Sequence, residues 1–378
     1  MHSFLSRRRF LETSAGFGGS IITCSMPLNR SANAAAARIE APIVEEVTIH
    51  EITDNANDIF LKNFEGPGLK VTRPIGVGGE QGLTLESEWG LAMHVESRIG
   101  TDRRRYLLDF GFTPDVYANN LALLKIDVGQ VDALIISHGH YDHIGGLIGF
   151  LEANRSKMRK EMHLYTGGED DFCARFSPRP DGSFVNFGFP LDRQKLKSLE
   201  IQTVLSEAPI VMEGHGFTTG AVPRITFEHF PAGFVKYGQT NGLGCDTSAY
   251  QNHHFTAAEV AGKPIPDEHW HEHATCFRLG DRGLVVISSC GHAGIINTLK
   301  RAQEVSGVQK IYALVGGFHL APVPDDYLKK VMAELKTFDL EHVMPMHCSG
   351  QNFVDLAKQE IPEKLVLCGT GSSFTFTA

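Results

Sequence analysis

The sequence has little basic charge for its size. It carries 35 lysine and arginine residues against 44 aspartate and glutamate residues, which gives a formal net charge of −9 at pH 7. A protein that neutralises nucleic-acid phosphates needs a basic face, so this balance argues against nucleic-acid binding. We interpret the one basic cluster in the body of the chain, RSKMRK at 155–160, as a solvated helix end.

Several catalytic motifs are absent as well. The sequence has no Gly-x-Ser-x-Gly nucleophile elbow, no Gly-x-x-x-x-Gly-Lys phosphate loop and no dinucleotide-binding Gly-x-Gly-x-x-Gly after a strand. Its seven cysteines include no Cys-x-x-Cys pair, so a zinc ribbon or a thioredoxin-like site has no support. We favour buried free thiols, and pairing in an oxidising compartment remains the alternative because connectivity cannot be read from sequence.

The N-terminal segment 1–34 is interpreted as a targeting signal that is not part of the folded domain. Consecutive arginines in SRRRFLE (6–12) precede a weakly apolar stretch at 14–28 and small residues at 32–34. This pattern resembles a twin-arginine export signal, which implies export by that machinery, already folded, to the periplasm or the medium. The apolar stretch is too short and too polar for a stable membrane anchor. Cys24 leaves a lipoprotein as the alternative.

The rest of the chain alternates β-branched runs with amphipathic stretches. Eight runs predict strands, at 44–53, 91–97, 104–111, 131–138, 273–279, 283–290, 310–317 and 342–348. Five stretches predict helices, at 114–126, 143–156, 293–306, 324–338 and 353–361. Strands and helices in both halves favour an α+β domain over 42–378, with two sheets and helices outside them. Residues 166–272 are rich in Gly, Pro and Phe, and we expect an insertion with strands of its own there.

Four side chains able to bind a metal lie within six positions of ISHGHYDHIGGL (136–147). His138, His140, Asp142 and His143 follow the apolar run VDALIIS and precede two glycines that permit a sharp turn into a helix. Imidazoles and carboxylates at this density are mutually costly unless a cation holds them. The pattern therefore predicts a metal site at the end of a strand.

Three later histidines occur in the same local setting. His292, His319 and His347 each follow an apolar run and lie beside glycine or another small residue. Mixed sheets place their chemistry at strand ends, so we expect these side chains to join the first cluster.

Together these motifs resemble the metallo-β-lactamase superfamily, whose signature is His-x-His-x-Asp-His. The resemblance implies an αββα sandwich with one or two metal ions at one edge of its sheets. It assigns His138, His140 and His292 to a first metal site and Asp142, His143 and His347 to a second. It also assigns Asp109 the role of bracing the ligand loop, which suits an acceptor for an imidazole N–H.

A closer likeness is to the branch named for dihydropterin-aminobenzene-phosphate synthase. It rests on SEWGLAMHVE, ISHGHYDHIGGL, TTGAVPR, SSCGHAGI and VGGFHL and covers most of the chain from about 44 onward. The bridging aspartate that the family implies near 316–319 is absent, and GGFH offers His319 instead. Either His319 contributes to the site or the second metal is held more weakly.

We therefore expect an exported hydrolase with one or two divalent ions, Zn²⁺ being favoured over Mn²⁺ or Fe. Metal-bound hydroxide would attack an ester, lactone or phosphoester of a small-molecule substrate, with Asp142 as the catalytic residue that orients it. The alternatives are a transferase like the synthase of that branch, an iron-dependent oxidoreductase on the same fold, and a non-catalytic metal-binding protein.

Other candidate residues lie outside these motifs. His269, His271 and His273 alternate, and we favour a polar strand entrance over a metal-binding edge or substrate wall. His253 and His254 are expected at the surface. Arg224 would meet an anionic substrate group or form a structural ion pair. A larger aromatic set would line a pocket or fill a local core, and consists of Phe184, Phe187, Phe189, Phe234 and Tyr237.

Overall fold

A computed structural model describes residues 38–230, 233–237, 239–240, 243–246 and 257–378. The proposed export signal at 1–34 and the pair His253 and His254 lie outside these residues. Residues 36–378 cluster as one compact unit, and the following description concerns that unit alone. Among the described residues, no helix is both long enough and apolar enough to cross a membrane.

Two large sheets make up most of the unit. The nine-stranded sheet has the order β11-β8-β7-β6-β5-β2-β22-β4-β3. In that order its strands are Ile201–Leu205, Met162–Thr166, Ala133–Ile135, Asp102–Leu108, Ala92–Ile99, Glu46–Thr53, Ser373–Thr377, Leu69–Thr72 and Phe64–Gly66. The C-terminal strand β22 lies between β2 and β4, so strands from the two ends of the domain pair side by side within this sheet.

The seven-stranded sheet has the order β12-β13-β18-β19-β20-β21, with β1 paired to β18. Its strands are Val211–Met212, Gly216–Thr218, Thr275–Leu279, Gly283–Ser288, Ile311–Gly317 and His342–Met346, with β1 at Ile43–Val44. Strands β19, β20 and β21 run parallel, so their carboxyl ends meet at one edge. All eight strands expected from the sequence are present.

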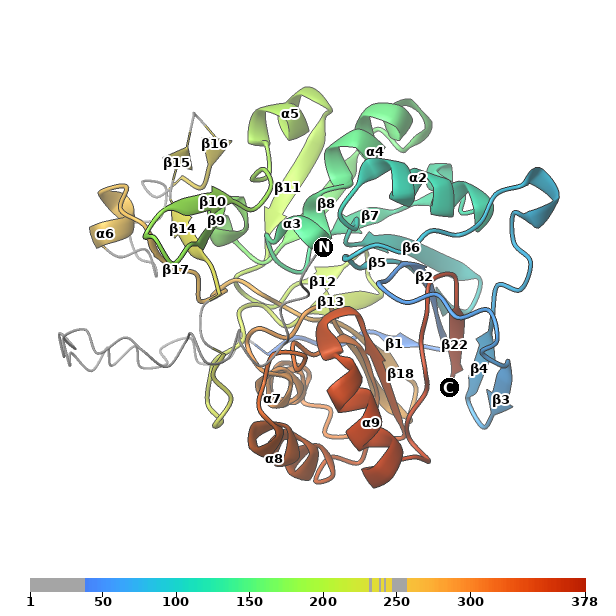
Figure 1. Cartoon of the computed structure of the whole chain (residues 1–378). Helices are drawn as coiled ribbons and strands as arrows, with labels where there is room; N and C mark the ends of the chain where they lie inside the picture. Colours follow the sequence, from blue (N-terminus) through green and yellow to red (C-terminus); the bar gives the residue numbers. More distant parts are fainter. Residues whose placement is uncertain (1–37, 231–232, 238, 241–242, 247–256) are drawn as a thin grey trace, which may run out of the picture. The chain divides into compact units, whose positions relative to one another are not determined.

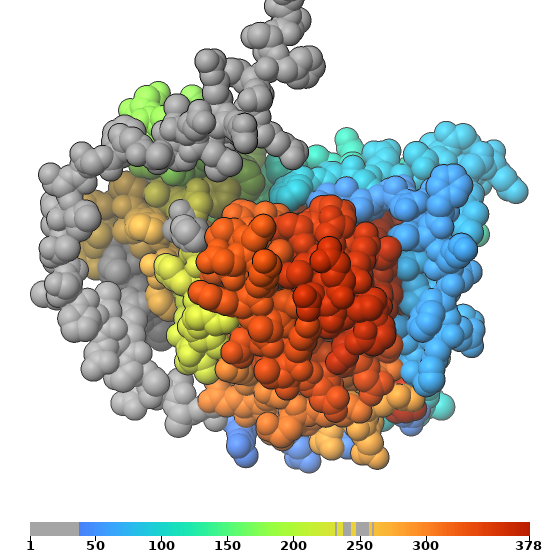
Figure 2. Space-filling model, turned by 60° about the horizontal axis from the view of Figure 1, so that its bottom comes forward, coloured from blue at the N-terminus to red at the C-terminus, as the bar shows by residue number. Residues whose placement is uncertain are grey.

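Helices cover the outer face of each sheet (Figure 1). On the nine-stranded sheet these are α2 (Pro114–Leu123), α4 (Leu147–Asn154) and α5 (Arg193–Ser198). On the seven-stranded sheet they are α7 (Ile295–Ser306), α8 (Asp325–Leu335) and α9 (Gln351–Glu360). The C-terminal part of the chain, orange to red in Figure 2, forms one continuous face bordered by the blue N-terminal strands.

Shorter elements complete the chain. Within the part of the chain that the structure describes, the remaining helices are α3 (Tyr141–Ile144) and α6 (Ala257–Val260), with 3-10 turns at Gly79–Gln81, Val128–Gln130, Arg155–Lys157, Glu169–Phe172 and His347–Ser349.

The four layers follow from strands that are apolar on both faces. In β19, Leu284 and Val286 pack against the helices, whereas Val285 and Ile287 pack between the sheets. A strand with period two and no polar face must be covered on both sides, which explains the sandwich of sheets between helices. The α+β sandwich expected from the sequence is confirmed.

Residues 166–272 contribute strands to four different sheets. Strand β11 extends the nine-stranded sheet, and β12 and β13 extend the seven-stranded one. The rest of the segment forms a four-stranded sheet, β10-β9-β14-β17, and the pair β15-β16. These strands are Phe184–Asn186, Ala174–Pro178, Val235–Tyr237, Ile265–Pro266, Gln239–Thr240 and Leu243–Gly244. Along the chain, the strands that join the two main sheets (β11, β12 and β13) therefore lie between the strands of the smaller sheets.

Glu228 gives the fold a pH dependence that can be measured. Its Oε2 accepts the N–H of Asn297 in the first turn of α7 at 3.0 Å, and burial raises its pKa to about 7. Between pH 4.5 and 7 the unfolded chain loses this proton first, so the free energy of unfolding falls as pH rises. We expect Glu228→Gln to remove a pH-dependent component of about 2–3 kcal/mol.

Urea unfolding of both proteins at pH 5 and pH 8 measures this component. Other groups titrate in the same interval, so the quantity to compare is the difference between wild type and variant. An equal difference at both pH values would contradict the assignment.

Candidate metal centre

The first group of candidate ligands comes from two strand ends. His138 and His140 follow β7, and His292 follows β19. One ligand atom from each lies within 4.8 Å of the other two, and all three side chains are buried. The Nε2 atoms of these histidines have no hydrogen-bond partner. Nε2 of His140 also lies 3.6 Å from Asp267 Oδ2. Buried polar atoms are almost always hydrogen-bonded, so three buried nitrogens that lie this close together without a hydrogen bond fit a cation.

The second group lies beside the first. Asp142 and His143 lie in α3 and His347 follows β21. The Nε2 of His347 is 3.2 Å from Asp142 Oδ2, and the Nε2 of His143 is 4.0 Å from the same oxygen. The rings of His138 and His143 lie 4.3 Å apart between centroids, so the two groups adjoin. The structure thus brings six of the seven expected site residues together in the two sets that the resemblance assigned.

Asp109 fixes the orientation of the loop between β7 and α3. Its carboxylate accepts the N–H and the hydroxyl of Ser137, both at 2.8 Å, and its Oδ2 lies 2.8 Å from Nδ1 of His143. The hydroxyl of Ser137 is also 3.0 Å from Nδ1 of His138. These contacts hold Nδ1 of both imidazoles and leave Nε2 free, as is usual for metal-binding histidines.

Two buried acidic residues that the sequence did not indicate hold the other loops. Asp54 accepts the N–H of His347 at 2.8 Å. Glu272 accepts the N–H of Gly291 at 2.8 Å and that of Ala293 at 2.6 Å, which flank His292. Both carboxylates accept backbone N–H groups, and such contacts leave no spacing pattern in a sequence because almost every residue carries this donor.

Four non-glycine residues of the site have left-handed backbone. The φ angles are 57° at Asp109, 50° at His269, 50° at His319 and 47° at His347. Such conformations cost about 1–3 kcal/mol and persist where the surroundings impose them, which is common at functional sites.

The charges of the site are set by burial and by two carboxylates. Burial lowers the pKa of His138, His140 and His292, so these imidazoles are neutral, which is the form that binds a cation. Burial opposes the charge of His143 too, but Asp142 and Asp109 outweigh it and raise its pKa to about 9. Burial acts against ionised Asp142, yet His143 and His347 hold its pKa below the usual range.

His319 is placed differently from the other expected ligands. Its Nδ1 lies 3.7 Å from the sulfur of Cys290, and it groups with Cys290 and Cys348. Its ring is 4.0 Å from that of His292 between centroids. It therefore borders the first group through His292 without belonging to either histidine group.

The polar strand entrance expected at 269–273 is wrong. Strand β18 begins only at Thr275, and the three histidines have separate partners. His269 stacks on His292 with centroids 3.9 Å apart, whereas His271 Nδ1 accepts the N–H of Asp170 and His273 Nε2 donates to the carbonyl of Ile136. His269 thus lies in the cavity wall beside the first group, which agrees with the less favoured alternative of a substrate-facing wall.

His269 also groups with His140 and Asp267. The Oδ2 of Asp267 already accepts the Nε–H of Arg175 at 2.5 Å, with both groups buried. This carboxylate is therefore neutralised within the protein, which makes the group a weak candidate for a cation.

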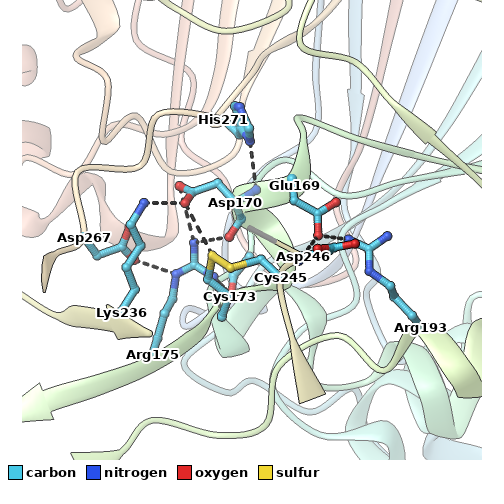
Figure 3. The surroundings of a disulfide bond; sticks show 11 residues. Glu169, Asp170, Cys173, Arg175, Arg193, Lys236, Cys245, Asp246, Asp267 and His271 are labelled. Atoms are coloured by element: carbon cyan, nitrogen blue, oxygen red, sulfur yellow. Dashed lines mark hydrogen bonds and ion pairs between the residues drawn. A yellow bond between two sulfur atoms is a disulfide. The ribbon is translucent and has the colours of Figure 1, made fainter. Parts of the chain in front are cut away.

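The Arg175 network surrounds a disulfide bond between Cys173 and Cys245 (Figure 3). Arg175 donates to the carbonyl of Gly139 at 3.1 Å, between His138 and His140, and Lys236 pairs with Asp170. The expectation of free thiols is wrong for these two cysteines. It holds for four others, Cys276, Cys290, Cys348 and Cys368.

A cavity of about 790 Å³ opens onto the site. His269, His292, His319 and Cys348 contribute to its wall. Its apolar wall consists of Trp89, Phe230, Phe234, Tyr327, Pro322, Val323 and Pro324, among others. The centre is therefore reached through an opening suited to a small organic molecule.

The aromatic residues and Arg224, for which the sequence left two roles open, lie in different environments. Phe234 lines the cavity and packs on Phe187, whereas Phe184 and Phe189 are exposed; the side chain of Tyr237 lies outside the described residues. Arg224 lines the cavity, donates to the carbonyl of Glu268 and lies 4.9 Å from the ring centroid of Trp270.

Comparisons with known proteins agree with this geometry. Residues 97–222 match the family model of the metallo-beta-lactamase superfamily. The 7,8-dihydropterin-6-methyl-4-(beta-D-ribofuranosyl)-aminobenzene-5'-phosphate synthase of Methanocaldococcus jannaschii is 25% identical over 77% of this chain and 90% of its own length. A metal-dependent hydrolase of Pelotomaculum thermopropionicum is 27% identical over 41% of this chain and 63% of its own length.

Among solved structures, a metal-dependent hydrolase of the beta-lactamase superfamily aligns with a TM-score of 0.60 and 23% identity. The alignment covers 86% of this chain and 98% of that one. The chain therefore has the metallo-β-lactamase fold, and its residues 97–222 carry the sequence pattern of the metallo-β-lactamase superfamily.

Proposed function

We propose that this protein is an exported metal-dependent hydrolase that cleaves a small ester, lactone or phosphoester. The observation that carries the proposal is the set of buried Nε2 atoms of four histidines that make no hydrogen bond and lie in two adjoining candidate ligand groups, one of which contains Asp142. Buried polar atoms without partners are rare in folded proteins, and here they share one centre. The histidines are His138, His140, His143 and His292.

The residues fit one or two divalent cations, His138, His140 and His292 holding one and Asp142, His143 and His347 the other. Nitrogen and oxygen donors suit zinc, and manganese or iron also accept them. When bound, such a cation lowers the pKa of its water toward ~7 and supplies hydroxide at neutral pH.

Asp142 is suited to orient the attacking water. Its Oδ2 faces His347 at 3.2 Å, its Oδ1 has no partner, and its low pKa keeps it ionised at neutral pH. His143 balances this negative charge and is itself held by Asp109.

The cavity supports a substrate that combines an apolar or flat part with an anionic group. Aromatic side chains at Trp89, Phe234 and Tyr327 suit the first, and the guanidinium of Arg224 suits the second.

A transferase resembling the dihydropterin-aminobenzene-phosphate synthase is the second candidate. The relative of that name aligns over 90% of its length, and an aromatic wall accommodates a flat heterocycle. Formation of a new carbon–carbon or carbon–nitrogen bond, without ester cleavage, would favour it.

Export is part of the proposal and is supported by two features. The arginine-rich segment at 6–12 suits the twin-arginine machinery, and a disulfide such as Cys173–Cys245 persists in oxidising compartments.

Removal of the metal tests the hydrolase. We expect His138→Ala, or a chelator, to lower kcat/KM about a thousandfold or more, because the cation contributes several kcal/mol of transition-state stabilisation. Cleavage of aryl esters, lactones and phosphodiesters is measured beside metal content by mass spectrometry.

His163→Ala is the matched control, because His163 pairs with Glu213 at 3.1 Å outside the site. It should keep both metal and activity. Unchanged turnover in the chelated protein would contradict the proposed function.

A further inference from the structure

Two cysteines and a histidine lie together at the ends of three neighbouring strands. Cys290 follows β19, His319 follows β20 and Cys348 follows β21, and these strands run parallel in that order. The two sulfurs are 3.2 Å apart, and Nδ1 of His319 is 3.7 Å from Cys290 Sγ. The topology of the sheet therefore gathers three soft or borderline ligands that are 29 and 58 residues apart in sequence.

This group is contiguous with the histidine groups. The sulfur of Cys290 also lies within 4.8 Å of a ligand atom of His138 and of His143. These two histidines belong to different groups of the centre. Cys290 is therefore within reach of both histidine groups and also of His319 and Cys348.

The backbone of β20 lies close to the second sulfur. A Cβ added at Gly317 would lie 2.9 Å from Cys348 Sγ, closer than side chains tolerate, and it would meet the carbonyl oxygen of Ser289 at 2.3 Å as well. The N–H of His319 points to the same sulfur at 3.3 Å, and His319 has left-handed backbone.

Simple packing of apolar thiols does not describe this group. Cys276 is such a thiol: it lies in the core among Phe217, Leu284 and Val286. Cys290 and Cys348 instead face imidazoles, and Cys348 and His319 both line the cavity, which provides an entry path for an ion.

Carboxylates do not supply an alternative ligand at this point. In the candidate ligand groups formed by the described residues, carboxylates occur only at Asp142 and Asp267. Both oxygens of nearby Glu272 already accept backbone N–H groups.

We propose that Cys290, His319 and Cys348 form a further cation-binding position that takes a thiophilic divalent ion, zinc in preference to magnesium or manganese. Thiolates select zinc, and its bonds to sulfur are about 2.3 Å long, so a small separation of the two sulfurs would admit it. The inference shares with the proposed function the premise that this edge of the sheets binds divalent cations.

Cobalt substitution tests the proposal directly. The full-length protein is purified under argon without added reductant, so that the disulfide between Cys173 and Cys245 stays intact and no external thiol contributes, and it is titrated with Co²⁺ alone. We expect a near-ultraviolet sulfur-to-cobalt charge-transfer band, which oxygen and nitrogen ligands do not give. Each of Cys290→Ser and Cys348→Ser should lower the band by about half, and the double variant should abolish it, because each removes one thiolate bond.

Cys276→Ser is the matched control, since it removes a buried thiol remote from the site, and it should leave the band unchanged. Circular dichroism checks the fold of each variant, and the wild-type spectrum is informative by itself. Cobalt-loaded wild type without the band, or a folded double variant that keeps it, would overturn the inference.

The two proposals fail in different ways. A band without hydrolysis supports the thiolate position and contradicts the hydrolase. Hydrolysis by protein that lacks the band contradicts the thiolate position alone.

Discussion

Asp142→Asn should lower kcat by about 10²-fold or more, because a small misplacement of the attacking water costs about that much. The amide keeps the shape of the side chain but removes its negative charge. It also removes the partner of His347, whose Nε2 lies 3.2 Å away. We therefore expect the second cation to be lost or weakened while the group of His138, His140 and His292 keeps its own.

Steady-state kinetics and metal content per chain measure this effect together. Asp132→Asn is the control, because Asp132 is as buried as Asp142 but accepts the backbone N–H of Arg105 at 2.7 Å, in contact with Arg159. Its replacement should affect stability and spare kcat. A folded Asp142→Asn enzyme with full turnover would end the assignment of Asp142 as the catalytic residue.

Arg175→Met should lower the free energy of unfolding by about 3–5 kcal/mol, the range for removing one partner of a buried ion pair. Arg175 is buried and pairs with Asp267 Oδ2 at 2.5 Å, and it donates to the carbonyls of Gly139, Cys173 and Asp170. Methionine fills similar volume but leaves the carboxylate of Asp267 without its guanidinium. Urea unfolding at neutral pH measures the loss.

Arg175→Met should also weaken metal binding about 10–100-fold, because the bond to Gly139 holds the loop that carries His138 and His140. Arg103→Met is the control: Arg103 is 41% exposed and pairs with Glu46 and Glu96 at the surface. Its replacement should cost less than about 1 kcal/mol. Equal effects of the two substitutions would show that the buried network contributes little.

Prediction of the fold succeeded where strands are buried on both faces. The runs at β7, β19 and β20 are continuous apolar stretches of strand length, so their position in a covered sheet is visible without tertiary information. The segment 166–272 was harder to interpret. Strands of only two or three residues, such as β12 and β13, carry no periodic signal, and their place in the sheet depends on long-range partners.

Prediction of the site succeeded where ligands are dense or follow an apolar run. His138, His140, Asp142 and His143 are close in sequence, and His292 and His347 follow recognisable strands. Cys290 and Cys348 were not expected at the centre, although Cys348 directly follows the predicted ligand His347 and Cys290 lies two residues before the predicted ligand His292. A single cysteine next to a histidine gives no spacing signal, and the contact between the two sulfurs exists only because β19, β20 and β21 are neighbours.

The sequence alone determined which segments are apolar on both faces and which strand ends carry imidazoles, since both are local properties of a few consecutive residues. The tertiary structure alone decided which of those ends meet. It placed His319 beside two thiols and paired Asp267 with Arg175. It also brought Asp54 and Glu272 into hydrogen bonds with backbone N–H groups of the ligand loops. These choices depend on strand order and on loops packed across hundreds of residues, and such contacts leave no period in the chain.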